Sequence, residues 1–176
     1  WGAIVGDAAK QRYKLLGQDL EGVKKELLEV NNLALEGKPE DMVITSHICR
    51  GNYHSTFFTS GPYDSVADYV FAKENVDALF LEYDDARSGG FAPLAKVSPD
   101  KKVVLGLITT KTPELEDKEV VIRRIHEAAK YIPLDRLYLS PQCGFASCEI
   151  GNKLTEEEQW AKLKLVKEIA EEVWGE

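Results

Sequence analysis

Three short segments of the sequence carry residue types that bind transition metals. His47 and Cys49 stand two residues apart, a spacing that points both side chains to the same side of an extended backbone. Glu82 follows the apolar residues 78–81, and Cys143 lies within Pro-Gln-Cys-Gly-Phe. One imidazole, one carboxylate and two thiols form a ligand set that suits zinc. The His-x-Cys pair is a weak signal alone, because a buried cysteine often behaves as a small apolar residue.

The elements around these residues predict that they converge. Four short apolar runs, at residues 42–46, 77–81, 102–108 and 136–140, are typical of buried strands. Strands joined by crossover helices should be parallel, and in such folds the working residues sit in the loops after the strands. Each of the three metal-binding segments comes at or after the end of a predicted strand. We therefore expect all of them to meet at one end of the sheet.

Apolar residues at helical spacing predict the helices between these strands. One long helix, weakened by two glycines, is expected over residues 10–35. Further helices are expected after Asp64, over residues 121–132, and from a capping box formed by Thr155 and Glu158. A helix followed by four strand-loop-helix units is an α/β chain. It forms either a small open doubly wound sheet or half of an eight-unit barrel, because four strands cannot close a barrel.

Composition and charge exclude several classes of partner. The 176 residues include 30 acidic and 22 basic side chains, giving a net charge of -8, and the basic ones are scattered. This argues against binding to nucleic acid or to an anionic membrane, and favours a small ligand. No apolar run approaches ~18 residues, and no secretory leader is recognisable. Three irregularly spaced cysteines fit a reducing compartment, so we expect a cytoplasmic protein.

The motifs around the metal-binding residues resemble those of a known family. The matching segments, in chain order, are His47-x-Cys49-Arg50-Gly51-Asn52, Leu81-Glu82-Tyr83-Asp84, Gly106-Leu107-Ile108-Thr109-Thr110-Lys111, Pro141-Gln142-Cys143-Gly144-Phe145-Ala146-Ser147 and Val173-Trp174-Gly175. They are similar to the C-terminal catalytic domain of cobalamin-independent methionine synthase, and most of all to its short, methionine-synthase-like members. The resemblance covers essentially the whole chain, with the motifs in the right order.

The resemblance implies a fold, a metal site and an activity. By resemblance His47, Cys49, Glu82 and Cys143 are zinc ligands. Residues 1–176 would form a single partial domain, the C-terminal half of a (β/α)8 TIM barrel with four parallel βα units preceded by a helix. Because the chain begins at Trp1 rather than Met, we expect it to be part of something longer. The implied reaction is methyl transfer to a thiol, with homocysteine giving methionine.

Two departures from the full-length enzyme concern the methyl donor. Lys111 stands where that enzyme has a histidine proposed to protonate the leaving folate, so Lys111 is a candidate proton donor, with a carboxylate contact or a surface lysine as alternatives. The loop at 52–62 is longer than its counterpart. The donor is therefore open between methyltetrahydrofolate, a corrinoid and another methyl carrier.

Three residues beside the metal-binding motifs are candidates for substrate binding. Arg50 and Asn52 flank the His-x-Cys pair, where they could contact substrate or orient the ligands as a second shell. Asp84 follows Glu82 and could contact substrate, or form an ordinary salt-bridge network with Asp85 and Arg87.

The expected ligand set suits alkyl transfer. Zinc deprotonates a bound thiol, and two cysteinates with one glutamate make the site anionic, which keeps a substrate sulfur electron-rich. Glu82 is our candidate for the ligand that gives way to that sulfur. Two alternatives stay open. The first is a structural zinc site. The second is a catalytically incomplete half-barrel whose unpaired edge strands pair with the missing half or with a second copy of the chain.

Overall fold

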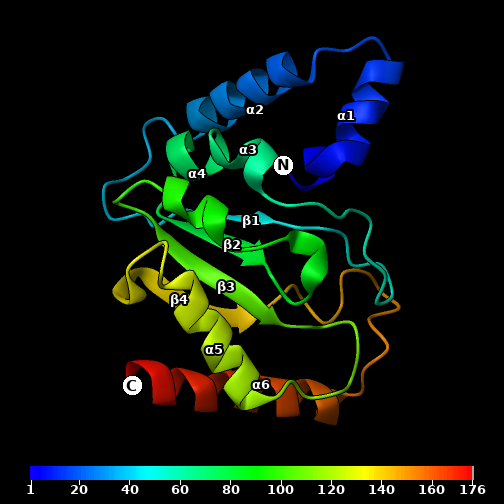
Figure 1. Cartoon of the computed structure of the whole chain (residues 1–176), viewed down its shortest axis with the longest axis vertical. Helices are drawn as coiled ribbons and strands as arrows, with labels where there is room; N and C mark the ends of the chain where they lie inside the picture. Colours follow the sequence, from blue (N-terminus) through cyan, green and yellow to red (C-terminus); the bar gives the residue numbers. More distant parts are fainter. Residues whose placement is uncertain (176) are drawn as a thin grey trace.

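Four parallel strands form one sheet in the computed structural model, which describes residues 1–175. The strands are β1 (Thr45–Ile48), β2 (Ala78–Glu82), β3 (Lys102–Ile108) and β4 (Leu137–Pro141). Each strand pairs with its neighbour in sequence, in the order β1-β2-β3-β4 (Figure 1). A doubly wound sheet reverses its strand order at a switch point, whereas a barrel does not. The strand order therefore agrees with a half-barrel and excludes the doubly wound alternative.

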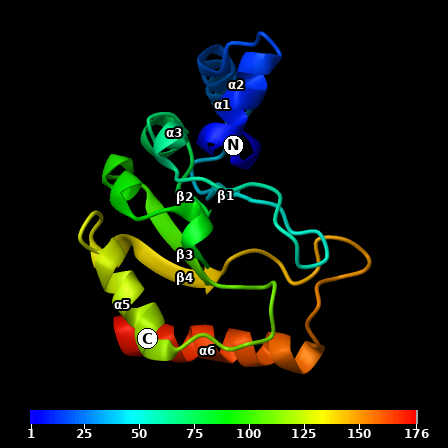
Figure 2. The same ribbon diagram turned by 45° about the vertical axis from the view of Figure 1, so that its right-hand side comes forward.

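Helices flank the sheet in space (Figure 2); in sequence they precede the first strand, lie between strands and follow the last strand. They are α1 (Gly6–Leu15), α2 (Leu20–Ala34), α3 (Asp64–Ala67), α4 (Val70–Lys73), α5 (Lys118–Ala128) and α6 (Glu156–Trp174). Short 3-10 helices occur at Gly2–Ile4, Ala86–Ser88, Ala92–Lys96 and Leu134–Arg136. Within the described part of the chain, no helix is long and apolar enough to cross a membrane.

The two faces of the sheet differ in burial. On one face the side chains form the hydrophobic core, and Leu79, Val103 and Leu105 are completely buried there. The strand register places His47 beside Phe80 on the opposite face. Because side chains alternate along a strand, Glu82 shares that face with Phe80. The open face and the carboxyl ends of the strands thus come together where the predicted ligands lie.

The expected single helix over residues 10–35 is wrong. Two helices, α1 and α2, occupy this segment, because Gly17 adopts a left-handed backbone conformation with φ +63°. Asp19 then caps α2 by accepting a hydrogen bond from the peptide N–H of Glu21 at 3.0 Å. The first strand is also displaced from the predicted residues 42–46, so that His47 lies within β1 instead of in the following loop.

Helix α6 begins with the predicted capping box of Thr155 and Glu158. Within this helix Trp160 is 59% exposed, whereas Lys162 is fully buried. The Lys162 ammonium donates to a carboxylate oxygen of Glu116 at 3.1 Å and to the carbonyl of Glu114 at 2.7 Å. Glu116 in turn accepts the peptide N–H of Thr109 at 2.8 Å. An ion pair between the fully buried Lys162 and the partly buried Glu116 therefore connects α6 with the loop after β3.

We expect Glu116→Gln to destabilise the protein by roughly 3–5 kcal/mol, because the substitution leaves the Lys162 ammonium buried without its counter-charge. Urea unfolding followed by circular dichroism measures this change. Glu168→Gln is the matched control, since Glu168 pairs with Lys164 at 3.8 Å on the exposed side of the same helix. Its effect should stay below about 1 kcal/mol. Equal effects of the two substitutions would contradict the importance of the buried pair.

Candidate metal centre

The four predicted metal ligands lie together at the carboxyl ends of the strands. The ligand atoms of His47, Cys49, Glu82 and Cys143 are all within 4.8 Å of one another. The two sulfur atoms are 3.9 Å apart, and His47 Nε2 lies 3.5 Å from Glu82 Oε1. Within residues 1–175 this is the one group of three or more His, Cys, Asp or Glu side chains arranged in this way.

These distances fit the coordination geometry of zinc. Two zinc–sulfur bonds of about 2.3 Å that meet at a tetrahedral angle separate their sulfurs by about 3.8 Å. Bonds of about 2.0–2.1 Å to nitrogen and oxygen separate those atoms by about 3.4 Å. The sulfurs of Cys49 and Cys143 are also much too far apart for a disulfide bond. The donor types and their spacing are therefore compatible with one tetrahedral zinc ion.

Local backbone features bring the three segments together. His47 lies in β1 and Cys49 directly after it, while Glu82 is the last residue of β2. Gly106 of β3 pairs with Glu82, and a Cβ atom at Gly106 would lie 2.8 Å from the Cα atom of Gln142. Glycine at this position allows the segment after β4 to cross close to the end of β3. Cys143 thereby reaches the other ligands.

The carboxylate of Glu82 is completely buried and charged. Burial acts to raise the pKa of Glu82, but hydrogen bonds to His47 and to the peptide N–H of Arg50, the latter at 3.0 Å, outweigh it. The pKa of Glu82 therefore lies below its usual value. A buried anion is costly unless a cation or several donors accompany it. This environment suits a bound metal ion.

Hydrogen bonds connect Cys49 with both Cys143 and His47, and they shift the pKa values of all three side chains. The hydrogen bond between the sulfurs raises the pKa of Cys49 to about 12 and lowers that of Cys143 to about 6. Hydrogen bonds to Cys49 and Glu82 raise the pKa of His47 to about 9. At neutral pH the cluster thus holds one thiolate, one thiol, one carboxylate and an imidazolium. A metal cation would displace the remaining protons.

Arg50 and Asn52 occupy different positions around the cluster. Arg50 is fully buried, and its guanidinium lies 4.2 Å from the centre of the Tyr63 ring and donates to the carbonyl of Gly61 at 2.8 Å. Full burial favours a positioning role for Arg50 over direct contact with a substrate. Asn52 donates to the carbonyl of Gly144 at 2.7 Å and so connects the loops that carry Cys49 and Cys143.

Lys111 is buried next to the cluster, so the alternative of a surface lysine is wrong. Its ammonium lies 3.4 Å from Asn52 Oδ1. Desolvation lowers the pKa of Lys111, although the negative charges of Glu82 and Asp84 partly oppose this. Asp84 is buried too, and it accepts a 2.6 Å hydrogen bond from Arg87, as expected for a salt-bridge network. Burial nevertheless raises the pKa of Asp84 above its usual value.

The sequence interpretation missed the contacts that fix the long loop at 52–62. His54 and Ser55 have positive φ angles of 44° and 67°. His54 Nδ1 lies 3.1 Å from the carbonyl of Gly151, and the peptide N–H of Ser55 donates to Asn152 at 3.3 Å. Asn152 also donates to the carbonyl of Thr110 at 2.7 Å. No local pattern could predict pairings between residues nearly a hundred positions apart.

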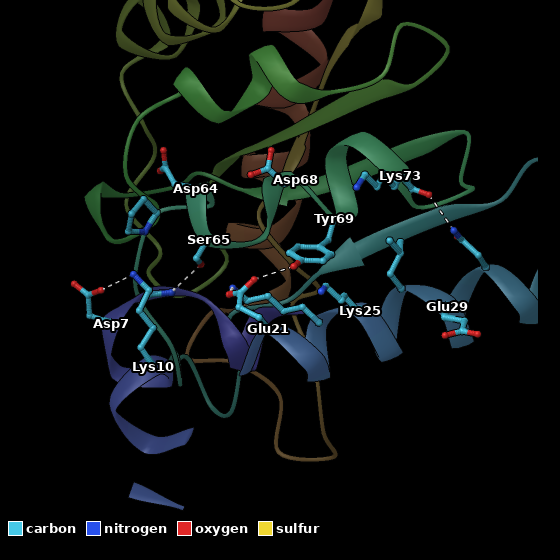
Figure 3. Close-up of a pocket in the computed structure, with 15 residues that line it drawn as sticks. Asp7, Lys10, Glu21, Lys25, Glu29, Asp64, Ser65, Asp68, Tyr69 and Lys73 are labelled. Atoms are coloured by element: carbon cyan, nitrogen blue, oxygen red, sulfur yellow. Dashed lines mark hydrogen bonds and ion pairs between the residues drawn. The ribbon is translucent and has the colours of Figure 1, made fainter. Parts of the chain in front are cut away.

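A hollow of about 420 Å³ opens beside the ligands, bordered by His47, Phe80 and Cys143. Its size is appropriate for a small molecule. A larger cleft of about 900 Å³ lies between α2 and α3, away from the cluster (Figure 3). Charged side chains of both signs line that cleft and pair with one another, as Glu21 does with Lys24 at 2.6 Å and with the hydroxyl of Tyr69 at 2.8 Å. The proposed ligands His47 and Cys143 line the smaller pocket and not the larger cleft.

Comparison with known proteins finds a matching family and several relatives. The family described as "Cobalamin-independent synthase, Catalytic domain" matches residues 26–172. The uncharacterised protein YxjH of Bacillus subtilis is 51% identical over 175 residues, which are 99% of this chain and 46% of that protein. The 5-methyltetrahydropteroyltriglutamate–homocysteine methyltransferase of Bacillus licheniformis is 25% identical over 96% of this chain and 20% of its own length.

Solved structures show the same relationship. The structure of a candidate vitamin-B12-independent methionine synthase from Listeria monocytogenes matches 100% of this chain and 46% of that chain, with a TM-score of 0.74 and 40% identity. A B12-independent methionine synthase from Shewanella sp. W3-18-1, solved with selenomethionine, has a TM-score of 0.66 and 25% identity over 83% of this chain and 42% of its own. The chain thus spans about half the length of the Bacillus subtilis relative and of these structures. It belongs to the cobalamin-independent methionine synthase family and carries part of that family's catalytic domain.

Proposed function

We propose that this chain binds one zinc ion through His47, Cys49, Glu82 and Cys143, and that the site activates the thiol of homocysteine for methylation to methionine. The observation that carries the proposal is the convergence of these four ligand atoms, from three strand ends, at distances suited to a tetrahedral ion. Structural zinc sites usually draw ligands from one compact knuckle or hairpin. Ligands at the ends of barrel strands occupy the place of an active site.

The proposed ligand set determines which reaction is favoured. Zinc supplies the Lewis acidity that deprotonates a bound thiol at neutral pH. Cys49, Cys143 and Glu82 contribute three negative charges, one more than the ion neutralises, and neutral His47 contributes none. A sulfur held by this anionic set stays electron-rich, which favours attack on a methyl group over activation of water. The carboxylate of Glu82, the hardest donor, is the one we expect to give way to the incoming sulfur.

Lys111 is the proposed proton donor on the methyl-donor side. Desolvation lowers its pKa, so the buried ammonium gives up a proton more readily than an exposed lysine would. Asn52 lies 3.4 Å away and holds the ammonium in place. Asn52, next to the Lys111 ammonium, is proposed to contact the substrates, whereas the buried side chain of Asp84 pairs with Arg87, which favours a positioning role. A methyl donor such as methyltetrahydrofolate would need this proton on its leaving nitrogen.

The complete activity is proposed for the assembled barrel. β1 and β4 are the edges of the sheet, and the face that carries His47 and Phe80 is partly open. We infer that a second barrel half, from a longer form of this chain or from a second copy, pairs with these edges and closes the substrate site. A reducing cytoplasm would keep Cys49 and Cys143 free for the metal.

Metal analysis of the purified chain tests the ligand assignment. We expect about one zinc per chain by plasma mass spectrometry, and a loss of affinity of at least about tenfold in Cys143→Ser, because a hydroxyl is a far weaker zinc ligand than a thiolate. Cys148→Ser is the control, since Cys148 is also a free thiol and lies outside the cluster. Equal zinc affinity of the two variants would exclude Cys143 as a ligand.

Zinc binding should release about two protons per ion at about pH 7.5. His47 and Cys49, with pKa values of about 9 and about 12, each hold a proton there, whereas Cys143, at about 6, and Glu82 do not. Affinity should therefore rise with pH, by about tenfold for each proton and each pH unit. Calorimetry in buffers of different ionisation enthalpy counts the protons. Binding without proton release would contradict coordination by His47 and Cys49.

A further inference from the structure

Arg87 contacts the buried carboxylate at the centre of the cluster. It lies in the short 3-10 helix Ala86–Ser88, whose start is capped by Asp85 accepting the peptide N–H of Arg87 at 2.8 Å. The Arg87 side chain is only 6% exposed. One guanidinium nitrogen, NH2, lies 3.4 Å from Glu82 Oε2 and 2.6 Å from Asp84 Oδ1, and the other, NH1, pairs with Asp85.

The two oxygens of Glu82 have different neighbours. Oε1 lies 3.5 Å from His47 Nε2 and accepts the peptide N–H of Arg50. Oε2 faces the guanidinium of Arg87. The carboxylate therefore presents one oxygen to the proposed metal ligands, while the other is engaged by a rigid planar cation. A carboxylate without such a partner could bind a metal through both oxygens.

The distances also show that Arg87 does not neutralise Glu82. Its short contact is with Asp84, at 2.6 Å against 3.4 Å for Glu82, and Asp85 takes its other nitrogen. The guanidinium is thus shared by three carboxylates, of which Glu82 and Asp84 are buried and Asp85 is exposed. Arg87 therefore supplies only part of the compensation for the Glu82 charge, alongside His47 and the peptide N–H of Arg50.

Arg87 also fixes the loop after β1 against the loop after β2. Its carbonyl accepts the peptide N–H of Gly61 at 2.7 Å, and its guanidinium lies 5.1 Å from the centre of the Phe57 ring. Both residues belong to the long loop that follows Cys49. The guanidinium is consequently held from several sides and has little freedom to move away from Glu82.

We propose that Arg87 is a positioning residue that holds Glu82 Oε2 and so makes Glu82 a metal ligand through Oε1 alone. This inference rests on the proposed zinc function and adds a residue that acts through a ligand. With Oε2 held away, Glu82 would contribute a single bond to the ion, one that an incoming substrate sulfur can replace. A purely structural salt bridge would stabilise the loop without any effect on the metal.

The test compares Arg87→Met with wild type in the 176-residue chain. Methionine keeps the length of the aliphatic part of the side chain and removes the guanidinium with its N–H donors. We expect zinc affinity, measured by competition with a chromophoric chelator, to fall by about 10–100-fold. With cobalt(II) as the probe metal, the visible absorption bands should weaken, because a freed Oε2 can bind as well and raise the coordination number from four to five.

A double-mutant cycle separates the positioning role from a general loss of structure. In a Glu82→Gln background, Arg87→Met should change zinc affinity by less than about twofold, because its effect is exerted through the carboxylate. Arg124→Met is the matched control: its guanidinium also lies over an aromatic ring, 5.5 Å from the centre of Phe91, and it makes no ion pair within residues 1–175 with the four proposed ligands. Its zinc affinity should stay within about twofold of wild type.

The outcomes distinguish this inference from the function on which it rests. If the wild-type chain binds no zinc, the proposed function fails and this inference fails with it. If wild type binds zinc and Arg87→Met binds equally well, or if the loss persists in the Glu82→Gln background, only the positioning role is overturned. Should Arg87→Met lose its native circular dichroism spectrum, Arg87→Lys replaces it, because lysine keeps the positive charge but lacks the planar guanidinium. Arg87→Lys should lose less zinc affinity than Arg87→Met, and this loss should again disappear in the Glu82→Gln background.

Discussion

The burial of the Glu82 carboxylate at the end of β2 is the constraint on which the rest of the site depends. A completely buried anion must be matched by donors and cations, and the chain provides His47, the peptide N–H of Arg50 and the guanidinium of Arg87. These partners do not fully neutralise it, since Arg87 is shared with two aspartates. The remaining negative charge and the two nearby thiols support the proposal that this cluster binds a metal cation.

The parallel sheet explains why these groups meet. Each ligand lies at or just after the carboxyl end of a strand, and the strand order places those ends along one edge. The packing of Gly106 against Gln142 brings the last ligand, Cys143, close to the first two. The loops then lock the arrangement, because Asn52 and Asn152 bond the segments after β1, β3 and β4 to one another. Fold and chemistry are thus connected through the strand ends.

Sequence patterns predicted the four strands, with the first displaced by a few residues, and the convergence of four metal-binding side chains, but they did not predict the surroundings of these side chains. β3 spans the predicted residues 102–108 because its apolar run is unbroken, and His47, Cys49, Glu82 and Cys143 converge because parallel strands require it. The break at Gly17 depended on a local backbone conformation that periodicity does not report. The burial of Lys111 and Lys162, and the contacts of Arg87, depend on distant partners, so only the three-dimensional structure shows them.

X-ray absorption at the zinc edge tests whether the proposed zinc site accepts a thiol. Spectra of the zinc-loaded chain are compared before and after addition of homocysteine, with homoserine, which lacks the sulfur, as the control ligand. We expect two sulfur neighbours at about 2.3 Å without the ligand and three with homocysteine. Homoserine should leave the sulfur count unchanged. A metal shell that stays the same with homocysteine would contradict thiol activation and would identify the site as structural.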